Sequence, residues 1–215
     1  MHSLIRRAWV EIDLGALLRN GAKIAAHSGV PLLPMVKADA YGLGAVRVAR
    51  ALERLQPWGF GVATIVEGEE LRAAGITRPI VVFTPLLTEE FDAAIRANLT
   101  PTLGDRVSIE RWSVYKRPWQ LSIDTGMSRA GIPWNRVDEL RDLLPMCPPE
   151  GVFTHFHSAE LTDASREQQE RRFADALAKL PVRVPMVHAE NGAAVEHRGG
   201  SRWSVVRPGI FLYGV

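Results

Sequence analysis

The stretch Pro34-Met35-Val36-Lys37-Ala38-Asp39-Ala40-Tyr41-Gly42-Leu43-Gly44 sets the organisation of the whole chain. An apolar run with two prolines, Val30 to Val36, predicts a short buried strand that ends at Lys37. A lysine there lies at the opening of the cavity that the strand would help to enclose, where its amine is available for imine chemistry. The glycines of the following Tyr-Gly-x-Gly turn allow backbone amides to approach an anion at a helix start. The alternative is a solvated lysine beside an ordinary turn.

The composition of the chain limits the classes of protein to which it can belong. The chain has 215 residues, 47% of them hydrophobic, which is enough to bury one sizeable core in a single α/β barrel or in two small domains. Its formal net charge of +2 and evenly spread charges give no sign of a nucleic-acid partner. No apolar run is long enough to span a bilayer, and Met1 to Arg7 lacks the apolar core of a secretory signal. The single cysteine, Cys147, excludes an intrachain disulfide and fits a cytoplasmic location.

Short apolar runs alternate with helical patterns along the chain. Trp9 to Ile12 alternates as an opening strand, and Asp13 is placed to cap the helix that follows. Eight further runs predict strands at 30–36, 60–63, 80–83, 99–103, 120–123, 152–156, 186–188 and 204–207. Helical patterns are found at 45–55, 67–74, 89–97, 107–115, 137–143 and 166–180.

This alternation predicts an α/β fold with a parallel sheet. Continuous apolar strands covered by helices are typical of parallel sheets, and eight such units close into a (β/α)8 TIM barrel. An open doubly wound sheet is the alternative, and it would call for a Gly-rich dinucleotide turn after an early strand. The first half of the chain contains no G-x-G-x-x-G, which favours the barrel.

Polar residues follow five of the eight predicted strands, at the end where barrels carry their chemistry. They lie in the segments 37–42, 124–129, 154–156, 188–192 and 207–210. Each has an ordinary structural explanation: 124–126 as a turn, His155 and His188 as satisfied core histidines, and Arg207 as a surface cation. Their common position at strand ends favours one shared site.

The sequences of these segments resemble the motifs of the alanine racemase family. Residues 36–42, Val-Lys-Ala-Asp-Ala-Tyr-Gly, are similar to the family's pyridoxal-phosphate lysine motif, with Asp39 and Leu43 in place of the usual Asn and His. The blocks Asp-Thr-Gly-Met-x-Arg, Thr-His-Phe, His-x-x-Asn-Ser and Arg-Pro-Gly-Ile-x-x-Tyr-Gly follow in the family's order, with one change at Gly192. The resemblance runs from Ala8 to Gly214.

The resemblance implies roles for individual residues. Lys37 would hold pyridoxal 5'-phosphate through an imine and, once freed by substrate, serve as the base on one face of the amino acid's α-carbon. The expected cofactor-binding residues are Lys37, Tyr41, His155, Asn191, Gly192, Arg207, Gly209 and Ile210. Arg129 would contact the substrate carboxylate, and His188 would support Arg207. Arg207 would face the pyridine nitrogen, and its fixed charge would disfavour protonation of that nitrogen. No metal is expected.

Three departures from the family pattern bear on these roles. Gly192 replaces a serine whose hydroxyl would reach the phosphate, and Ser122 replaces a carbamylated lysine that orients the arginine in many members. Relatives also continue past Gly214 into a β-domain, which supplies a second catalytic tyrosine across a head-to-tail homodimer. We therefore expect residues 1–215 to be the barrel domain of a longer racemase, or of one whose second part is encoded separately, with Trp9 to Ile12 left as an unprotected edge strand.

Two functions from different classes follow. The first is an isomerase, a pyridoxal-phosphate alanine racemase that interconverts L- and D-alanine for peptidoglycan. The second is a single-domain cofactor-binding protein that resembles the short pyridoxal-phosphate homeostasis proteins. The length of the chain favours the cofactor-binding protein, whereas the residues of the motifs favour the racemase. The expected small-molecule partner is a small amino acid, with alanine and serine both open, and neither a nucleic acid nor a membrane is expected.

Overall fold

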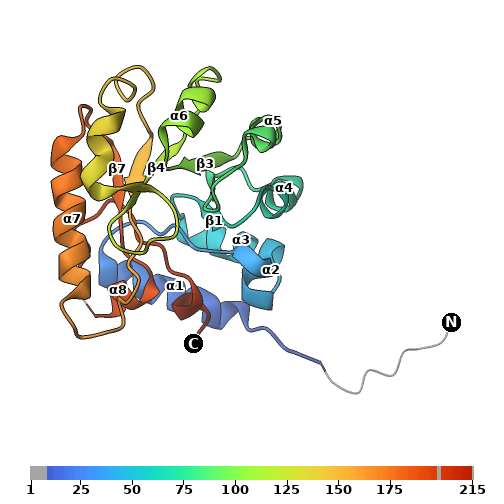
Figure 1. Ribbon diagram of the computed structural model, residues 1–215. Coiled ribbons are helices and arrows are strands. Elements are labelled where there is room, and N and C mark those ends of the chain that lie inside the picture. The colour runs from blue at the N-terminus through green and yellow to red at the C-terminus, as the bar shows by residue number, and fades with distance from the viewer. Residues whose placement is uncertain (1–8, 198–199, 215) are drawn as a thin grey trace.

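A curved parallel sheet with helices on its outer side forms the centre of the computed structural model (Figure 1). The structure describes residues 9–197 and 200–214. Met1 to Arg7, the segment that lacks the apolar core of a secretory signal, and Val215 lie outside the described residues. Six strands are neighbours in chain order: β1 (Phe60–Val62), β2 (Ile80–Val82), β3 (Thr100–Leu103), β4 (Gln120–Asp124), β6 (Gly151–Phe153) and β7 (Met186–His188). A short strand, β5 (Ile132–Pro133), pairs with β4 outside this path.

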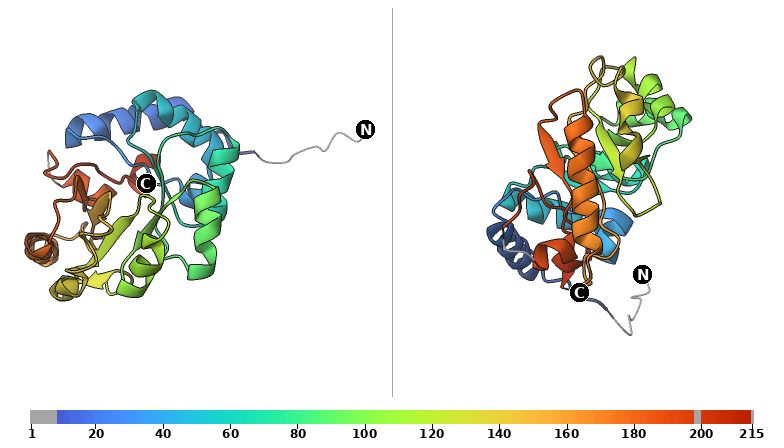
Figure 2. Two further views of the ribbon diagram at one scale, coloured as in Figure 1. Left: turned by 90° about the horizontal axis from the view of Figure 1, so that it is seen from above. Right: turned by 60° about the vertical axis from the view of Figure 1, so that its left-hand side comes forward.

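Two irregular segments, 31–36 and 204–207, close the sheet into a ring. Leu32 pairs with Val206 and Met35 with Gly61 through parallel bridges, and the Leu33 amide donates to the Val206 carbonyl at 2.8 Å. On the other side the Ser204 amide donates to the Val187 carbonyl at 2.8 Å. Eight parallel segments therefore enclose the core, which confirms the predicted barrel. Seen from above, the helices lie around this ring (Figure 2).

The helices follow the predicted patterns closely. The α-helices are α1 (Leu14–Ser28), α3 (Ala45–Leu52), α4 (Ile65–Ala73), α5 (Phe91–Arg96), α6 (Arg106–Ser113), α7 (Ser165–Lys179) and α8 (Gly192–Glu196), and α2 (Lys37–Gly42) is a single turn with left-handed backbone. Short 3₁₀-helices are found at Glu53–Leu55, Thr88–Glu90, Trp134–Leu140 and Ile210–Tyr213. Asp13 caps α1 by accepting from the Ala16 amide, as predicted. Thr64 and Glu67 form a capping box at the start of α4.

Several predicted elements were wrong in type or extent. Trp9 to Ile12 forms no strand, because no neighbouring strand pairs with it in the part of the chain that the structure describes. The helix expected at 137–143 is instead a 3₁₀-helix that starts at Trp134. The first and last barrel segments are bridges rather than full strands, since Pro31 and Pro34 have no N–H to donate to a ladder.

Apolar side chains fill both faces of the ring. The main cluster lies between strands and helices and includes Val36, Leu71, Phe91 and Trp112, each at most 1% exposed. A second cluster comes from strand segments alone: Leu33, Val81, Met186 and Val205. These segments are not all neighbours in the sheet, so their side chains meet inside the ring. No helix among the described residues is long and apolar enough to cross a membrane.

Candidate active site

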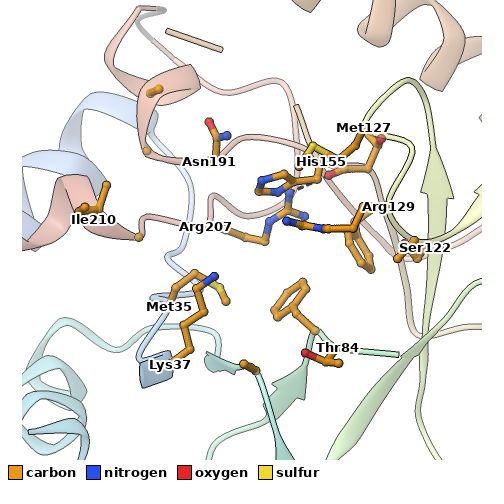
Figure 3. A pocket seen from close by; sticks show the side chains of 18 of the residues that line it. Met35, Lys37, Thr84, Ser122, Met127, Arg129, His155, Asn191, Arg207 and Ile210 are labelled. Carbon is orange, nitrogen blue, oxygen red and sulfur yellow. Dashed lines mark hydrogen bonds between the residues drawn. The ribbon is translucent and has the colours of Figure 1, made fainter. Parts of the chain in front are cut away.

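A cavity of about 620 Å³ opens at the carboxyl ends of the barrel strands (Figure 3). The segments that follow β1, β2, β4, β6 and β7 all contribute to it, together with the segments that follow residues 36 and 206. Its lining includes nine residues singled out from the sequence: Lys37, Tyr41, Arg129, His155, Asn191, Gly192, Arg207, Gly209 and Ile210. His188 is not part of the lining and lies behind Arg207. The scattered motifs therefore meet at one site.

Lys37 begins a turn of left-handed backbone. Residues 38–41 all have φ between 51° and 56°, a conformation that costs a non-glycine residue about 1–2 kcal/mol. The carboxylate of Glu67 holds the turn in place, because Oε1 accepts from the Ala38 amide at 2.8 Å and Oε2 from the Ala63 amide at 2.6 Å. Asp39 accepts from the Ala45 amide at 2.6 Å and so links the turn to α3. The strained turn fixes where the Lys37 side chain leaves the backbone.

The Lys37 amine points into the cavity, between Met35 and the guanidinium of Arg207 (Figure 3). Within residues 9–197 and 200–214 it has no hydrogen-bond or ion-pair partner, and the side chain is only partly exposed. An amine without a carboxylate partner is free to react with a carbonyl group.

Arg207 is buried, at 3% exposed, and held by neutral acceptors. Its Nη1 donates to His188 Nδ1 at 2.6 Å, and Nη2 donates to the carbonyls of Thr154 and Ala189 at 2.7 and 2.9 Å. The Phe153 ring lies 5.1 Å from the guanidinium carbon, within the range of cation–π attraction. Burial lowers the pKa of Arg207 to about 9, so the group stays charged at neutral pH.

The protonation of His188 follows from its two partners. Because a guanidinium can only donate, Nδ1 accepts from Arg207, and Nε2–H donates to Gln120 Oε1 at 2.8 Å. Burial, assisted by the charge of Arg207, holds the pKa of His188 well below its usual value. His188 is therefore neutral and fixes one orientation of the arginine.

Backbone amides gather at another side of the cavity. The starts of α8 and of the 3₁₀-helix at Ile210–Tyr213 both border it, and the amides of Gly209 and Ile210 make no hydrogen bond among the described residues, whereas Gly192 follows the parallel bridge between Asn191 and Arg207. Asn191 caps α8 by accepting from the Ala194 amide at 3.0 Å. The Tyr41 hydroxyl lies 2.7 Å from where a Cβ on Gly209 would be. Free amides and a hydroxyl suit an anion such as a phosphate.

Gly192 leaves no room for the serine expected at its position. A Cβ added there would lie 2.6 Å from the Cβ of Phe211. The close atom is a Cβ, which any residue other than glycine at position 211 would carry, and at position 192 only the backbone is available to a ligand.

Arg129 and His155 border the cavity from the loops after β4 and β6 (Figure 3). Asp124 shapes the Arg129 loop by accepting from the Gly126 and Ser128 amides at 2.9 and 3.1 Å. Arg129 has no carboxylate partner in the described chain, and Ser122, which lines the cavity, does not bond to it. Burial and the nearby cations lower the pKa of His155 to about 3, so its ring is neutral.

Several supporting residues were missed by the analysis of the sequence. Gln120 was detectable as a polar residue in an otherwise apolar run, and Glu67 as part of a Thr-x-x-Glu capping box. Phe83 and Phe153, which flank Arg207, carry no such signal, since aromatic residues in strands are most often core.

Comparisons with known proteins give one consistent result. The family model described as alanine racemase, N-terminal domain, matches residues 12–215. An alanine racemase of Synechocystis is 37% identical over 98% of this chain and 61% of its own length. The solved alanine racemase of Clostridium difficile 630 superposes with a TM-score of 0.92 at 31% identity, covering 99% of this chain and 60% of that one. A Bartonella henselae alanine racemase with covalently bound pyridoxal phosphate superposes at 0.86 and 27% identity, covering 95% and 62%. The chain thus spans about three-fifths of the length of these relatives.

Proposed function

Since the chain belongs to the alanine racemase N-terminal domain family, we propose that its barrel binds pyridoxal 5'-phosphate and forms part of an alanine racemase active site. Residues 1–215 then make up one barrel domain. The observation that carries the proposal is the shared cavity: the free amine of Lys37 and the charged guanidinium of Arg207 both border it, next to unpaired backbone amides. These are groups that suit an aldehyde, a ring nitrogen and a phosphate.

The residues of this chain then have distinct tasks. Tyr41, the backbone of Gly192 and the amides of Gly209 and Ile210 hold the phosphate. When bound, the cofactor supplies an aldehyde for imine formation and a ring that acidifies the α-hydrogen of an attached amino acid. Lys37 binds this aldehyde and later holds or releases the proton on one face of the α-carbon.

Arg207 and His188 set the electrostatics at the ring nitrogen. A guanidinium has no acceptor, and its positive charge disfavours a second positive charge beside it. His188 is locked as an acceptor for Arg207 and cannot deliver a proton to it. Arg207 would therefore keep a ring nitrogen held beside it unprotonated, which suits simple proton exchange. His155 would lie beside the ring, and Arg129 would take the carboxylate of the amino acid.

Racemisation requires a second proton carrier on the opposite face of the α-carbon. The family resemblance assigns it to a tyrosine outside these 215 residues, reached across a head-to-tail homodimer. Alanine is the proposed substrate, as the names of the relatives indicate. A cytoplasmic location is part of the proposal and fits a chain whose single cysteine is a free thiol.

Cofactor attachment at Lys37 is the first test. Pyridoxal phosphate is added, the adduct is reduced with borohydride, and the labelled peptide is found by mass spectrometry. We expect one dominant label at Lys37 and loss of the bound cofactor's absorbance in Lys37→Ala. Lys23→Ala, at an exposed lysine of α1, is the matched control and should keep both signals. Labelling spread over surface lysines and unchanged by Lys37→Ala contradicts the proposal.

Formation of D-alanine from L-alanine, with and without the C-terminal domain of a relative, separates the two candidate functions. Activity that appears only with that domain supports the racemase. Cofactor binding through Lys37 without activity in either case supports the cofactor-binding protein instead.

A further inference from the structure

The side chain of Gln169, on the inner side of α7, joins two loops of the candidate site. It is 1% exposed. Its Nε2 donates to Thr125 Oγ1 at 3.1 Å and to the His155 carbonyl at 3.0 Å, while its Oε1 accepts from the His157 amide at 3.1 Å. One buried amide thus holds the loop after β4 and the loop after β6. Both of its donor hydrogens and its acceptor oxygen are used.

Neighbouring contacts reinforce this connection. Thr125 Oγ1 lies 2.7 Å from Thr154 Oγ1, so the ends of β4 and β6 are also joined directly. One helical turn further along α7, Arg172 Nη1 donates to the Thr125 carbonyl at 2.9 Å. A Cβ on Gly126 would lie 3.2 Å from that same nitrogen, so the loop packs closely against the helix.

The two loops carry two residues of the proposed site, Arg129 for the carboxylate of the amino acid and His155 for the cofactor ring. Arg129 lies four residues beyond Thr125, and its own side chain has no hydrogen-bond or ion-pair partner among residues 9–197 and 200–214. His155 supplies the carbonyl that Gln169 binds. The position of Arg129 relative to His155 therefore depends on the backbone of its loop, which Gln169 and Arg172 fix.

We propose that Gln169 is a positioning residue, which fixes the loop of Arg129 against the loop of His155 and so places Arg129 to bind the carboxylate of the amino acid. This inference rests on the proposed function for the identity of the ligand. Gln169 touches no substrate, and it acts through the loop that carries Arg129. Catalytic geometry is sensitive to such support, since displacements of about 1 Å at a binding group lower rates by about a hundredfold.

The test measures carboxylate affinity directly and needs neither cofactor nor turnover. Propionate is titrated into the wild-type chain and into Gln169→Met, which removes the donors and the acceptor without adding charge. Binding is followed by the NMR signals of the His155 ring, which lies beside Arg129. We expect propionate to bind about tenfold more weakly to the variant, as expected when buried hydrogen bonds are lost. Gln168→Met, at the adjacent exposed position of α7, is the matched control and should bind as the wild type does.

A double-mutant cycle distinguishes positioning from general support of the fold. In an Arg129→Lys background, the further loss caused by Gln169→Met should shrink, because both changes act on one contact. Thr125→Val, which removes one bond to Gln169 together with the bond to Thr154, provides a second variant if Gln169→Met does not fold, and should give a loss in the same direction. Equal losses in both backgrounds, unchanged affinity in the variants, or no propionate binding by the wild type would overturn the inference. Failure of the Lys37 labelling experiment would remove the proposed function but leave this measurement intact.

Discussion

At the scale of single residues, the anion-binding side of the cavity depends on the absence of a side chain at Gly209. A Cβ there would lie 2.7 Å from the Tyr41 hydroxyl, too close for two non-bonded heavy atoms. The Tyr41 ring packs against Tyr213, with ring centroids 4.9 Å apart, so it is not free to move aside. We predict that Gly209→Ala weakens pyridoxal-phosphate affinity by about tenfold or more, measured by absorbance titration, and also lowers the unfolding midpoint, because overpacking against a fixed ring costs about 1–3 kcal/mol.

The cause of that loss can be isolated with a second substitution. Tyr41→Phe removes the hydroxyl that the new Cβ would meet, at the expense of one proposed phosphate contact. If the clash is responsible, Gly209→Ala with Tyr41→Phe loses less affinity than the sum of the two single variants. Additive losses would show that Gly209 matters for another reason.

At the scale of elements, Arg72 of α4 connects two turns at the amino-terminal side of the barrel. Its guanidinium donates to the carbonyls of Ile76, Arg78, Ala97 and Asn98, at 2.7 to 3.2 Å. These carbonyls belong to the segments that lead into β2 and β3. We predict that Arg72→Ala lowers the free energy of unfolding by about 2–4 kcal/mol, measured by urea denaturation, because four acceptors lose a charged donor.

Arg96→Ala is the control for this prediction, since Arg96 is an exposed arginine on the next helix, α5. It should change stability by less than about 0.5 kcal/mol. Cofactor binding by Arg72→Ala should stay near the wild-type value, because Arg72 lies away from the carboxyl ends of the strands. A stability loss no larger than that of the control would contradict the role given to Arg72.

The elements also show what the sequence could and could not predict. Runs such as Ile80–Val82 and caps such as Asp13 have strong local signals, and they were predicted close to their observed bounds. The left-handed turn at 38–41 was not predicted, because Ala38 and Ala40 are ordinary helix formers and only the hydrogen bonds from Glu67 and Asp39 hold them there. Motif residues of the candidate site, Gln169 included, were recognisable one by one, whereas the hydrogen bonds of Gln169 depend on long-range packing that no local pattern reveals.

At the scale of the whole molecule, ring closure is what brings the site together. Lys37 and Arg207 are 170 positions apart in the chain, yet they border one cavity because the segments that precede them pair in the barrel. The same closure holds two neutral histidines, the half-buried His155 and the buried His188, beside the positive charge of Arg207. The stability of the protein at acid pH should therefore report on the integrity of the site.

The direction of this pH dependence follows from the two pKa values. Both histidines have a folded pKa far below the unfolded value of about 6.5, so the unfolded chain binds more protons as the pH falls. The contribution of each neutral histidine to the free energy of unfolding is fully present above pH 6.5. It declines below that pH, by up to about 1.4 kcal/mol per pH unit for each histidine. Glu150, whose pKa is raised by burial, increases the free energy of unfolding as the pH falls toward 4.5. This single group opposes the loss from two histidines. We predict a net fall in the urea midpoint between pH 6.5 and 4.5.

Replacement of one buried histidine should halve this slope. His188→Gln removes one titrating group, and although it lowers stability at every pH by disturbing Arg207, the change of stability with pH between 6.5 and 4.5 should drop to about half. His197→Gln, at an exposed histidine after α8, should leave the slope in place. An unchanged slope in His188→Gln would mean that the ring closure does not keep this histidine neutral. The charges assigned to Arg207 and His188, beside the proposed position of the ring nitrogen, would then have to be revised.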